Sequence, residues 1–147
     1  MKIGIAADHG GFELKEYLKK FLEDEGYAIT DYGAYSLNPD DDYPDFVIPL
    51  AKAVSEKKMD KGIAICGSGV GAAIAANKIK GIRAALINDH FSAHQGVEDD
   101  NMNMLCLGGR VTASSAAEEY TMAFLLAVFS GLARHKRRLK KIADLEK

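Results

Sequence analysis

Short apolar segments alternate with segments of helical periodicity along the chain, and this alternation constrains the fold more than any other feature. The apolar segments have the length of strands and are too apolar for a half-exposed sheet, which is typical of parallel strands covered on both faces. They comprise residues 3–7, 27–32, 62–66, 83–87 and 104–107. The helical segments comprise residues 12–22, 44–58, 91–98, 113–130 and 134–147. One more helical segment follows the turn 67–71 and runs to residue 80. This order predicts an α/β fold, a Rossmann-like three-layer sandwich with a five-stranded parallel sheet and a C-terminal basic helix.

Length and composition narrow the class of protein. The chain has 147 residues, which suits one domain over residues 1–147 with a single core. Its formal net charge of -2 argues against a strongly basic nucleic-acid-binding protein. No apolar run reaches the roughly 20 residues of a membrane-spanning helix, and the first residues lack the apolar stretch of a signal peptide. The two cysteines, Cys66 and Cys106, show no metal-type spacing, so we expect free thiols in the cytoplasm.

Polar or glycine-rich segments follow three of the predicted strands. They are residues 8–9, 66–71 and 108–110. In doubly wound sheets, ligands bind beyond the carboxyl ends of the strands. The sequence therefore predicts a ligand site where these three segments meet.

The segment Cys66-Gly67-Ser68-Gly69-Val70-Gly71 combines a thiol with a turn that opens a helix. The positive end of a helix dipole stabilises a thiolate, and glycines let backbone N–H groups surround a small anion. This combination suits proton abstraction beside a carbonyl, where an enediolate forms. A buried structural cysteine before a tight turn is the alternative. The segment lacks the Lys-Ser/Thr ending of a phosphate-binding Walker loop.

Two further groups of polar residues are candidates for substrate binding. Asp8 and His9 follow the first strand and can hold sugar hydroxyls and phosphate, or can simply cap the next helix. Arg134 and Arg138 lie four residues apart on one helix face, so both can reach one phosphate, or the basic helix can be solvated.

Two acidic segments give little support to a metal site. Residues 90–103 contain His90, His94 and three consecutive acids, and they form either a site loop or the end of a surface helix. The run 40–42 lacks the spaced ligands of a calcium loop and is expected to be solvated. We therefore expect neither a metal nor another cofactor.

The chain resembles ribose-5-phosphate isomerase B and the related galactose-6-phosphate isomerase subunits, from Met1 to about Ile142. The resemblance is carried by residues 8–10, 42–44, 62–71, 75–78, 81–84, 103, 109–111, 134–135 and 138. It implies a metal-free enediol mechanism and a homodimer, or a tetramer, with each site at the subunit interface. It also implies a small sugar phosphate as the ligand and no nucleic-acid or membrane partner.

The resemblance also implies a role for individual residues. Cys66 resembles the base that moves a proton between C1 and C2, and the turn from Gly67 to Gly71, with the Ser68 hydroxyl, resembles the enediolate-binding site. Asp8 resembles the residue that holds the sugar. The phosphate would be bound by His9, Arg134 and Arg138, while Tyr43, Asn77 and Asn103 would line or support the site.

One pair of residues departs from the family pattern. Family members with a ring-opening histidine usually have His-Asn where this chain has Asp99 and Asp100. Imidazole exchanges protons near neutral pH, whereas an aspartate with a reference pKa of about 3.9 is mostly ionised. Either Asp99 has a raised pKa and acts on the ring while Asp100 binds the substrate, or another group such as His94 opens the ring, or no ring needs opening. A four-carbon aldose 4-phosphate cannot close a five-membered ring because its O4 is esterified.

The sequence thus predicts an aldose–ketose isomerase that converts ribose 5-phosphate to ribulose 5-phosphate. Isomerisation of a four-carbon erythrose or erythrulose phosphate, or of a six-carbon sugar phosphate, is the alternative within the class. A non-catalytic sugar-phosphate-binding protein is the alternative outside it. A thiol redox protein is disfavoured because Cys66 has no resolving cysteine nearby.

Overall fold

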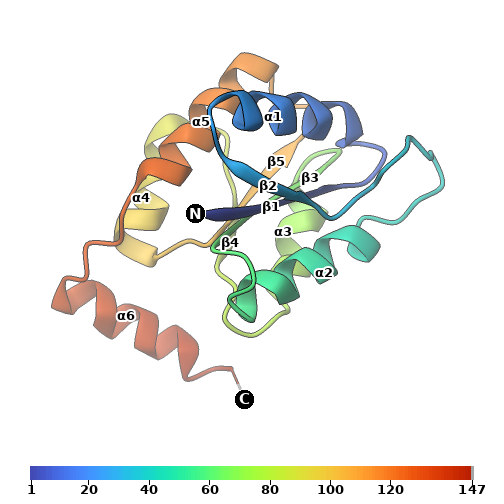
Figure 1. Ribbon diagram of the computed structural model, residues 1–147. Coiled ribbons are helices and arrows are strands. Elements are labelled where there is room, and N and C mark those ends of the chain that lie inside the picture. Colours follow the sequence, from blue (N-terminus) through green and yellow to red (C-terminus); the bar gives the residue numbers. More distant parts are fainter. Residues whose placement is uncertain (147) are drawn as a thin grey trace.

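The computed structural model describes residues 1–146, and its centre is a five-stranded parallel sheet (Figure 1). The strands are β1 (Lys2–Ala7), β2 (Ala28–Asp31), β3 (Lys61–Cys66), β4 (Ala84–Leu86) and β5 (Met104–Gly108). The helices are α1 (Phe12–Asp24), α2 (Pro44–Ser55), α3 (Val70–Ala76), α4 (His90–Asp100), α5 (Ser114–Leu126) and α6 (Ala133–Ala143). All strand pairings are parallel, which confirms the predicted α/β three-layer fold.

Helices cover both faces of the sheet, because alternate side chains of each strand point to opposite faces. On one face, Ile5 and Ile63 pack with buried residues of α1, α4 and α5, such as Leu18 and Phe124. On the other face, smaller side chains such as Ala64 pack against α2 and α3. Helix α6 lies outside both layers and projects from the body near α4 (Figure 1).

The order of the strands, β2-β1-β3-β5-β4, brings the candidate residues together. The chain direction across the sheet reverses between β1 and β3, which is where such folds bind ligands. Strand β5 lies between β3 and β4, so the carboxyl ends of β1, β3 and β5 are neighbours. Asp8, Cys66 and the segment 108–110 therefore meet at one edge of the sheet.

Several helices differ in length from the prediction: α2 ends at Ser55 rather than at residue 58, and α6 ends at Ala143 rather than at residue 147. Helix α3 ends at Ala76 rather than at residue 80, because the Asn77 side chain bonds both the N–H and the C=O of Ala84 (2.9 and 2.8 Å). Helix α5 ends at Leu126 rather than at residue 130, where Lys61 Nζ donates to the Phe124 carbonyl (2.7 Å). Helix α4 is longer than predicted and runs from His90 to Asp100.

Two contacts fix α6 to the rest of the chain. The His135 ring is buried, with Nδ1 2.6 Å from Ser130 Oγ and Nε2 3.4 Å from a carboxylate oxygen of Asp99. Near the end of the described chain, both carboxylate oxygens of Glu146 accept the Gly81 N–H at 3.0 Å. None of the helices among residues 1–146 is long and apolar enough to cross a membrane.

Candidate active site

A cavity of about 370 Å³ opens at the carboxyl ends of β1, β3 and β5. Its lining comprises Asp8, Tyr43, Cys66, Gly67, Ser68, Gly71, Arg110 and Val111. A thiol, a carboxylate, a phenol, a hydroxyl and a guanidinium thus face one small volume. The volume lies within the range of about 300–1,000 Å³ that is usual for small-molecule sites.

Cys66 ends β3 and its side chain is 5% exposed, at the floor of the cavity. The Gly69 N–H donates to its Sγ across 3.2 Å, so a backbone dipole points at the sulfur. Gly69 has a φ of +84°, and a Cβ there would lie 2.9 Å from the Leu107 carbonyl carbon. Only glycine fits this position without strain, and the turn therefore delivers its amide to the sulfur.

The three strand ends approach one another through their backbones. The Gly109 N–H donates to the Cys66 carbonyl (2.8 Å), and the Arg110 N–H donates to the Gly67 carbonyl (3.0 Å). A Cβ on Gly109 would lie 2.2 Å from the Gly10 carbonyl oxygen, so a side chain there would push apart the segments that follow β5 and β1. These contacts hold Arg110 close to Gly67. A Cβ built on Gly67 would lie 3.6 Å from the nearest guanidinium nitrogen of Arg110.

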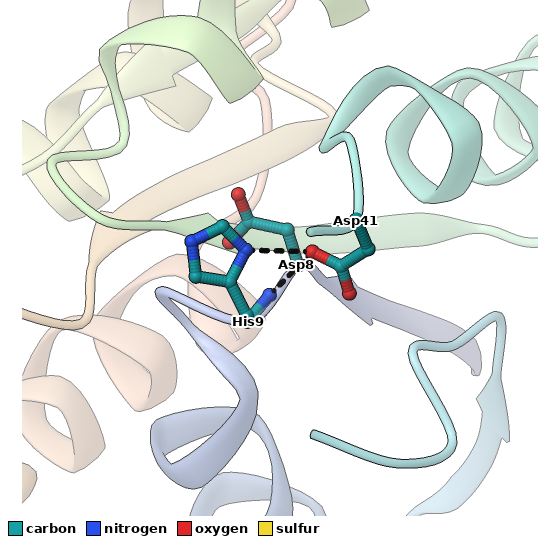
Figure 2. Close-up of side chains that lie close together, drawn as sticks. All are labelled: Asp8, His9 and Asp41. Carbon is teal, nitrogen blue, oxygen red and sulfur yellow. Dashed lines mark hydrogen bonds and ion pairs between the residues drawn. The ribbon is translucent and has the colours of Figure 1, made fainter. Parts of the chain in front are cut away.

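Asp8, His9 and Asp41 form a cluster beside this cavity (Figure 2). Asp8 is 6% exposed, and its Oδ1 accepts the Gly10 N–H at 2.9 Å. Asp41 Oδ1 accepts two donors from His9, the backbone N–H at 2.9 Å and the ring Nδ1 at 2.7 Å. The hydrogen bond to Asp41 raises the pKa of His9 above 6.5, with the charges of Asp8 and Asp41 adding to it, while burial and Arg110 act in the opposite direction.

The predicted solvated loop at residues 40–42 is wrong in part. Asp40 is exposed, but the Asp41 side chain is only 9% exposed because it turns inward to His9. Arg110 lines the cavity, although the sequence predicted only its segment, residues 108–110, at the ligand site and gave this side chain no role. A basic residue directly after a buried strand was the available signal, whereas nothing in the sequence pointed to the pairing of Asp41 with His9.

Two predicted residues lie away from the cavity and bond to the backbone instead. Asn77 holds the backbone of Ala84, as described above. The Asn103 amide accepts the Arg83 N–H (2.8 Å) and donates to the Gly81 carbonyl (2.9 Å). Both side chains therefore support the start of β4.

Five other residues that the sequence singled out do not line the cavity within one chain. Asp99 accepts a hydrogen bond from Gln95 Nε2 (2.7 Å) and lies beside the buried His135. Asp100 lines a separate cavity with Arg83 and Met102. Arg134 and Arg138 are exposed on α6. His94, the alternative ring-opening group, lies on α4 with its Nδ1 3.1 Å from Glu98.

One group among residues 1–146 has donor atoms close enough for a metal ion. The ligand atoms of Asp8, His9 and Asp41 lie within 4.8 Å of one another. Their hydrogen bonds already pair His9 Nδ1 with Asp41 and Asp8 Oδ1 with Gly10. The cluster is therefore accounted for by bonds between its own residues and the backbone.

Comparison with known proteins places this geometry in a family. Residues 3–142 match the model of a family described as Ribose/Galactose Isomerase. The chain belongs to this family. The solved structure of Clostridium thermocellum ribose-5-phosphate isomerase B is 43% identical, has a TM-score of 0.95 and is matched over 99% of this chain and 97% of that one.

Two other relatives of the chain indicate which sugar phosphates such proteins bind or convert. A structure of Mycoplasma genitalium ribose-5-phosphate isomerase B contains bound ribulose 5-phosphate. It is 40% identical, with a TM-score of 0.94, and the match covers 99% of this chain and 95% of that one. D-Erythrulose-4-phosphate isomerase of Pectobacterium atrosepticum is 37% identical over 131 residues, which are 89% of this chain and 86% of the relative.

Proposed function

We propose that this protein interconverts ribose 5-phosphate and ribulose 5-phosphate, with Cys66 as the base that transfers the proton between C2 and C1. The supporting observation is the sulfur at the cavity floor, which receives the Gly69 N–H and shares the cavity with Asp8 and Arg110. A relative with 40% identity binds the ketose of this pair, ribulose 5-phosphate. Both cysteines are free, as the cytoplasmic compartment that we propose requires.

The reaction needs one carbon base and a site for an oxyanion. The Cys66 thiolate removes the C2 proton of the open-chain aldose, and the electrons shift so that the C1 carbonyl oxygen becomes the oxyanion of an enediolate. The N–H groups of the turn 67–71 and the Ser68 hydroxyl stabilise that oxyanion. The thiol returns the proton to C1, while the C2 hydroxyl proton passes to O1 and C2 becomes the ketone.

The cationic side chains that we propose for the phosphate do not lie together within one chain. Arg110 lines the cavity and His9 lies beside it, whereas Arg134 and Arg138 are on α6, the helix that projects from the body in Figure 1. We infer that α6 of a second copy completes each cavity, so that the protein is a homodimer with shared sites. Exposed apolar side chains such as Val111 and Val128, 62% and 77% exposed, are available to such an interface. Residues 1–147 would form one isomerase domain in each copy.

Subunit complementation tests this arrangement. Cys66→Ala and the double variant Arg134→Ala/Arg138→Ala should each be nearly inactive at low substrate concentration. If sites are shared, unfolding and refolding an equimolar mixture produces hybrid dimers with one intact site, and about a quarter of wild-type activity returns. No recovery above the separate variants would contradict shared sites. Replacing Arg137, also exposed on α6, is the matched control and should leave activity unchanged.

A deuterium-exchange assay tests whether the protein is an enzyme at all. The wild type should move solvent deuterium into C1 of ribulose 5-phosphate or C2 of ribose 5-phosphate, because the thiol exchanges its proton with water. A protein that only binds sugar phosphates would retain phosphate-dependent affinity without exchange. That second outcome would overturn the proposed function in favour of the binding protein.

A four-carbon substrate is the second candidate, and Asp99 favours it. Its carboxylate is engaged by Gln95 and lies 3.4 Å from His135, so it is poorly suited to protonating a sugar ring oxygen. A related enzyme is named D-erythrulose-4-phosphate isomerase. The kcat/KM values for four-, five- and six-carbon sugar phosphates should be measured side by side. A higher value for ribose 5-phosphate than for any tetrose phosphate would exclude this candidate.

A further inference from the structure

We propose that Asp41 is a positioning residue for His9, holding its ring so that Nε2 can donate to the phosphoryl group of the sugar phosphate. This inference rests on the proposed function for the identity of the ligand. It assigns a role to a loop residue that contacts the substrate only through His9.

The geometry of the pair determines the tautomer of the ring. One oxygen of Asp41 accepts both the backbone N–H and the ring Nδ1 of His9, at 2.9 and 2.7 Å. An ionised carboxylate has no proton to donate, so Nδ1 must carry the hydrogen. Nε2, on the opposite side of the ring in Figure 2, is then the nitrogen that gains or loses a proton. It has no hydrogen-bond partner among residues 1–146, so it is available to a ligand.

The Asp41 carboxylate forms its hydrogen bonds with His9 alone among the described residues. The side chain is 9% exposed, and its second oxygen is buried without a hydrogen-bond partner in the described chain. Both donors to the carboxylate therefore come from His9. A buried carboxylate favours a positive charge on its neighbour, so Asp41 favours the imidazolium form of His9.

Three charged groups face the His9 ring, and their balance decides its charge. Asp41 from the loop before α2 and Asp8 from the end of β1 favour the imidazolium, whereas Arg110 after β5 opposes it. With His9 protonated, the imidazolium and the Arg110 guanidinium supply two positive charges beside the cavity. A phosphate monoester carries close to two negative charges at neutral pH, so this pair matches its charge.

The variant Asp41→Asn separates charge from shape. Its amide oxygen can still accept both His9 donors, so the loop is kept while the negative charge is lost. Asp40→Asn removes the same charge from the neighbouring, exposed position and is the matched control. Asp41→Ala removes both the acceptor and the charge.

The first measurement is an NMR titration of the His9 ring nitrogens. We expect the Nδ1–H tautomer in the wild type at high pH, a titration midpoint at lower pH in Asp41→Asn, and loss of the tautomer preference in Asp41→Ala. Asp40→Asn should titrate like the wild type. A His9 midpoint that does not move in Asp41→Asn, or one that moves equally in Asp40→Asn, would overturn the proposal.

The second measurement is binding of inorganic phosphate between pH 5.5 and 8. Asp41→Asn should bind phosphate about threefold to tenfold more weakly at pH 7.5, because a smaller fraction of His9 is protonated once the negative charge of Asp41 is lost. The two proteins should converge at pH 5.5, where His9 is protonated in both. A deficit independent of pH would indicate a structural role only and would overturn the proposal.

Steady-state kinetics provide a third, independent test of the role of Asp41. Asp41→Asn should raise KM for the phosphorylated substrate while kcat stays within about twofold, because the base and the oxyanion site are untouched. A fall in kcat with KM unchanged would contradict the assigned role. A wild type without isomerase activity would defeat the proposed function, while NMR and phosphate binding would still decide the role of Asp41.

Discussion

The Gly69 N–H donates a hydrogen bond to the Cys66 sulfur across 3.2 Å. The sulfur is thus in contact with a backbone amide although its side chain is only 5% exposed. A buried thiolate without a donor would be strongly disfavoured. The bond therefore links the glycine-rich turn directly to the base that we propose.

Replacing Cys66 with alanine should reduce kcat by at least about a hundredfold, since a general base contributes that much or more. Binding of inorganic phosphate should persist, because the cationic groups are unchanged. Steady-state kinetics and calorimetry measure the two properties. Cys106→Ala, a buried position on β5 away from the cavity lining, is the control and should keep its turnover. Retention of more than a tenth of the rate by Cys66→Ala would place the base elsewhere.

Iodoacetamide should alkylate Cys66 and spare Cys106. Cys66 lines the cavity, whereas Cys106 is fully buried, and burial raises the pKa of its thiol to about 12, with the nearby Cys66 adding to the shift. Peptide mass spectrometry gives the site of labelling, and loss of activity should follow labelling of Cys66. Labelling of Cys66 with activity intact would contradict the proposed base.

Replacing Arg110 with glutamine should raise KM for the sugar phosphate about tenfold or more, since a charge-assisted hydrogen bond to phosphate is lost. The guanidinium lies over Gly67 and lines the cavity. The kcat should change less than KM if Arg110 binds the phosphate. Arg137→Gln on α6 is the control for removing one positive charge. Equal KM values in the two variants would exclude Arg110 from substrate binding.

The ion pair between the buried Lys15 and Asp31 should stabilise the fold at neutral pH and lose this effect in acid. Its ammonium, with no exposed surface, lies 2.8 Å from Asp31. Burial disfavours the charged form of Asp31, but hydrogen bonds from Lys15 and the Gly33 N–H outweigh this and hold the pKa of Asp31 below 3.8. Asp31→Asn should therefore lower the free energy of unfolding at pH 7 by about 3 kcal/mol, as expected when one partner of a buried pair is removed.

The sign of the pH dependence distinguishes this pair from a general packing effect. A carboxyl whose pKa is lower in the folded state stabilises the fold above its unfolded pKa, and the stabilisation is lost as the pH falls through the folded value. The difference between wild type and Asp31→Asn should thus be constant above about pH 5 and shrink below pH 3.8. Urea denaturation across this range measures it. Asp24→Asn, in an exposed pair with Lys20, should show no such difference. A difference that does not change with pH would contradict the prediction.

Hydrophobic periodicity was sufficient for the order of the elements and for the three layers, because a strand buried on both faces cannot tolerate polar residues. It also placed Cys66 and its turn correctly, since the glycines mark a backbone that must approach other groups. The same periodicity says nothing about which strands are neighbours. The position of β5 between β3 and β4 therefore had to come from the structure, whereas the segment 108–110 was already expected at the ligand site because it follows a strand.

The remaining errors concern polar side chains whose partners are distant in the sequence. Asp41 is 32 residues from His9, and only the folded loop brings its carboxylate to the ring. The ends of α3 and α5 were misplaced because Asn77 and Lys61 terminate these helices through side-chain bonds to the backbone. Asp99 and Arg134 do not reach the cavity within one chain, and their roles stay predictions.

The insertion of β5 between β3 and β4 also has a consequence for biosynthesis. A nascent chain that has emerged only as far as α4 carries β3 and β4 without the strand that joins them. Both strands then present unpaired backbone edges, which favour association with other chains. Residues 104–111 therefore supply both the strand that joins β3 to β4 and two residues of the cavity lining, Arg110 and Val111.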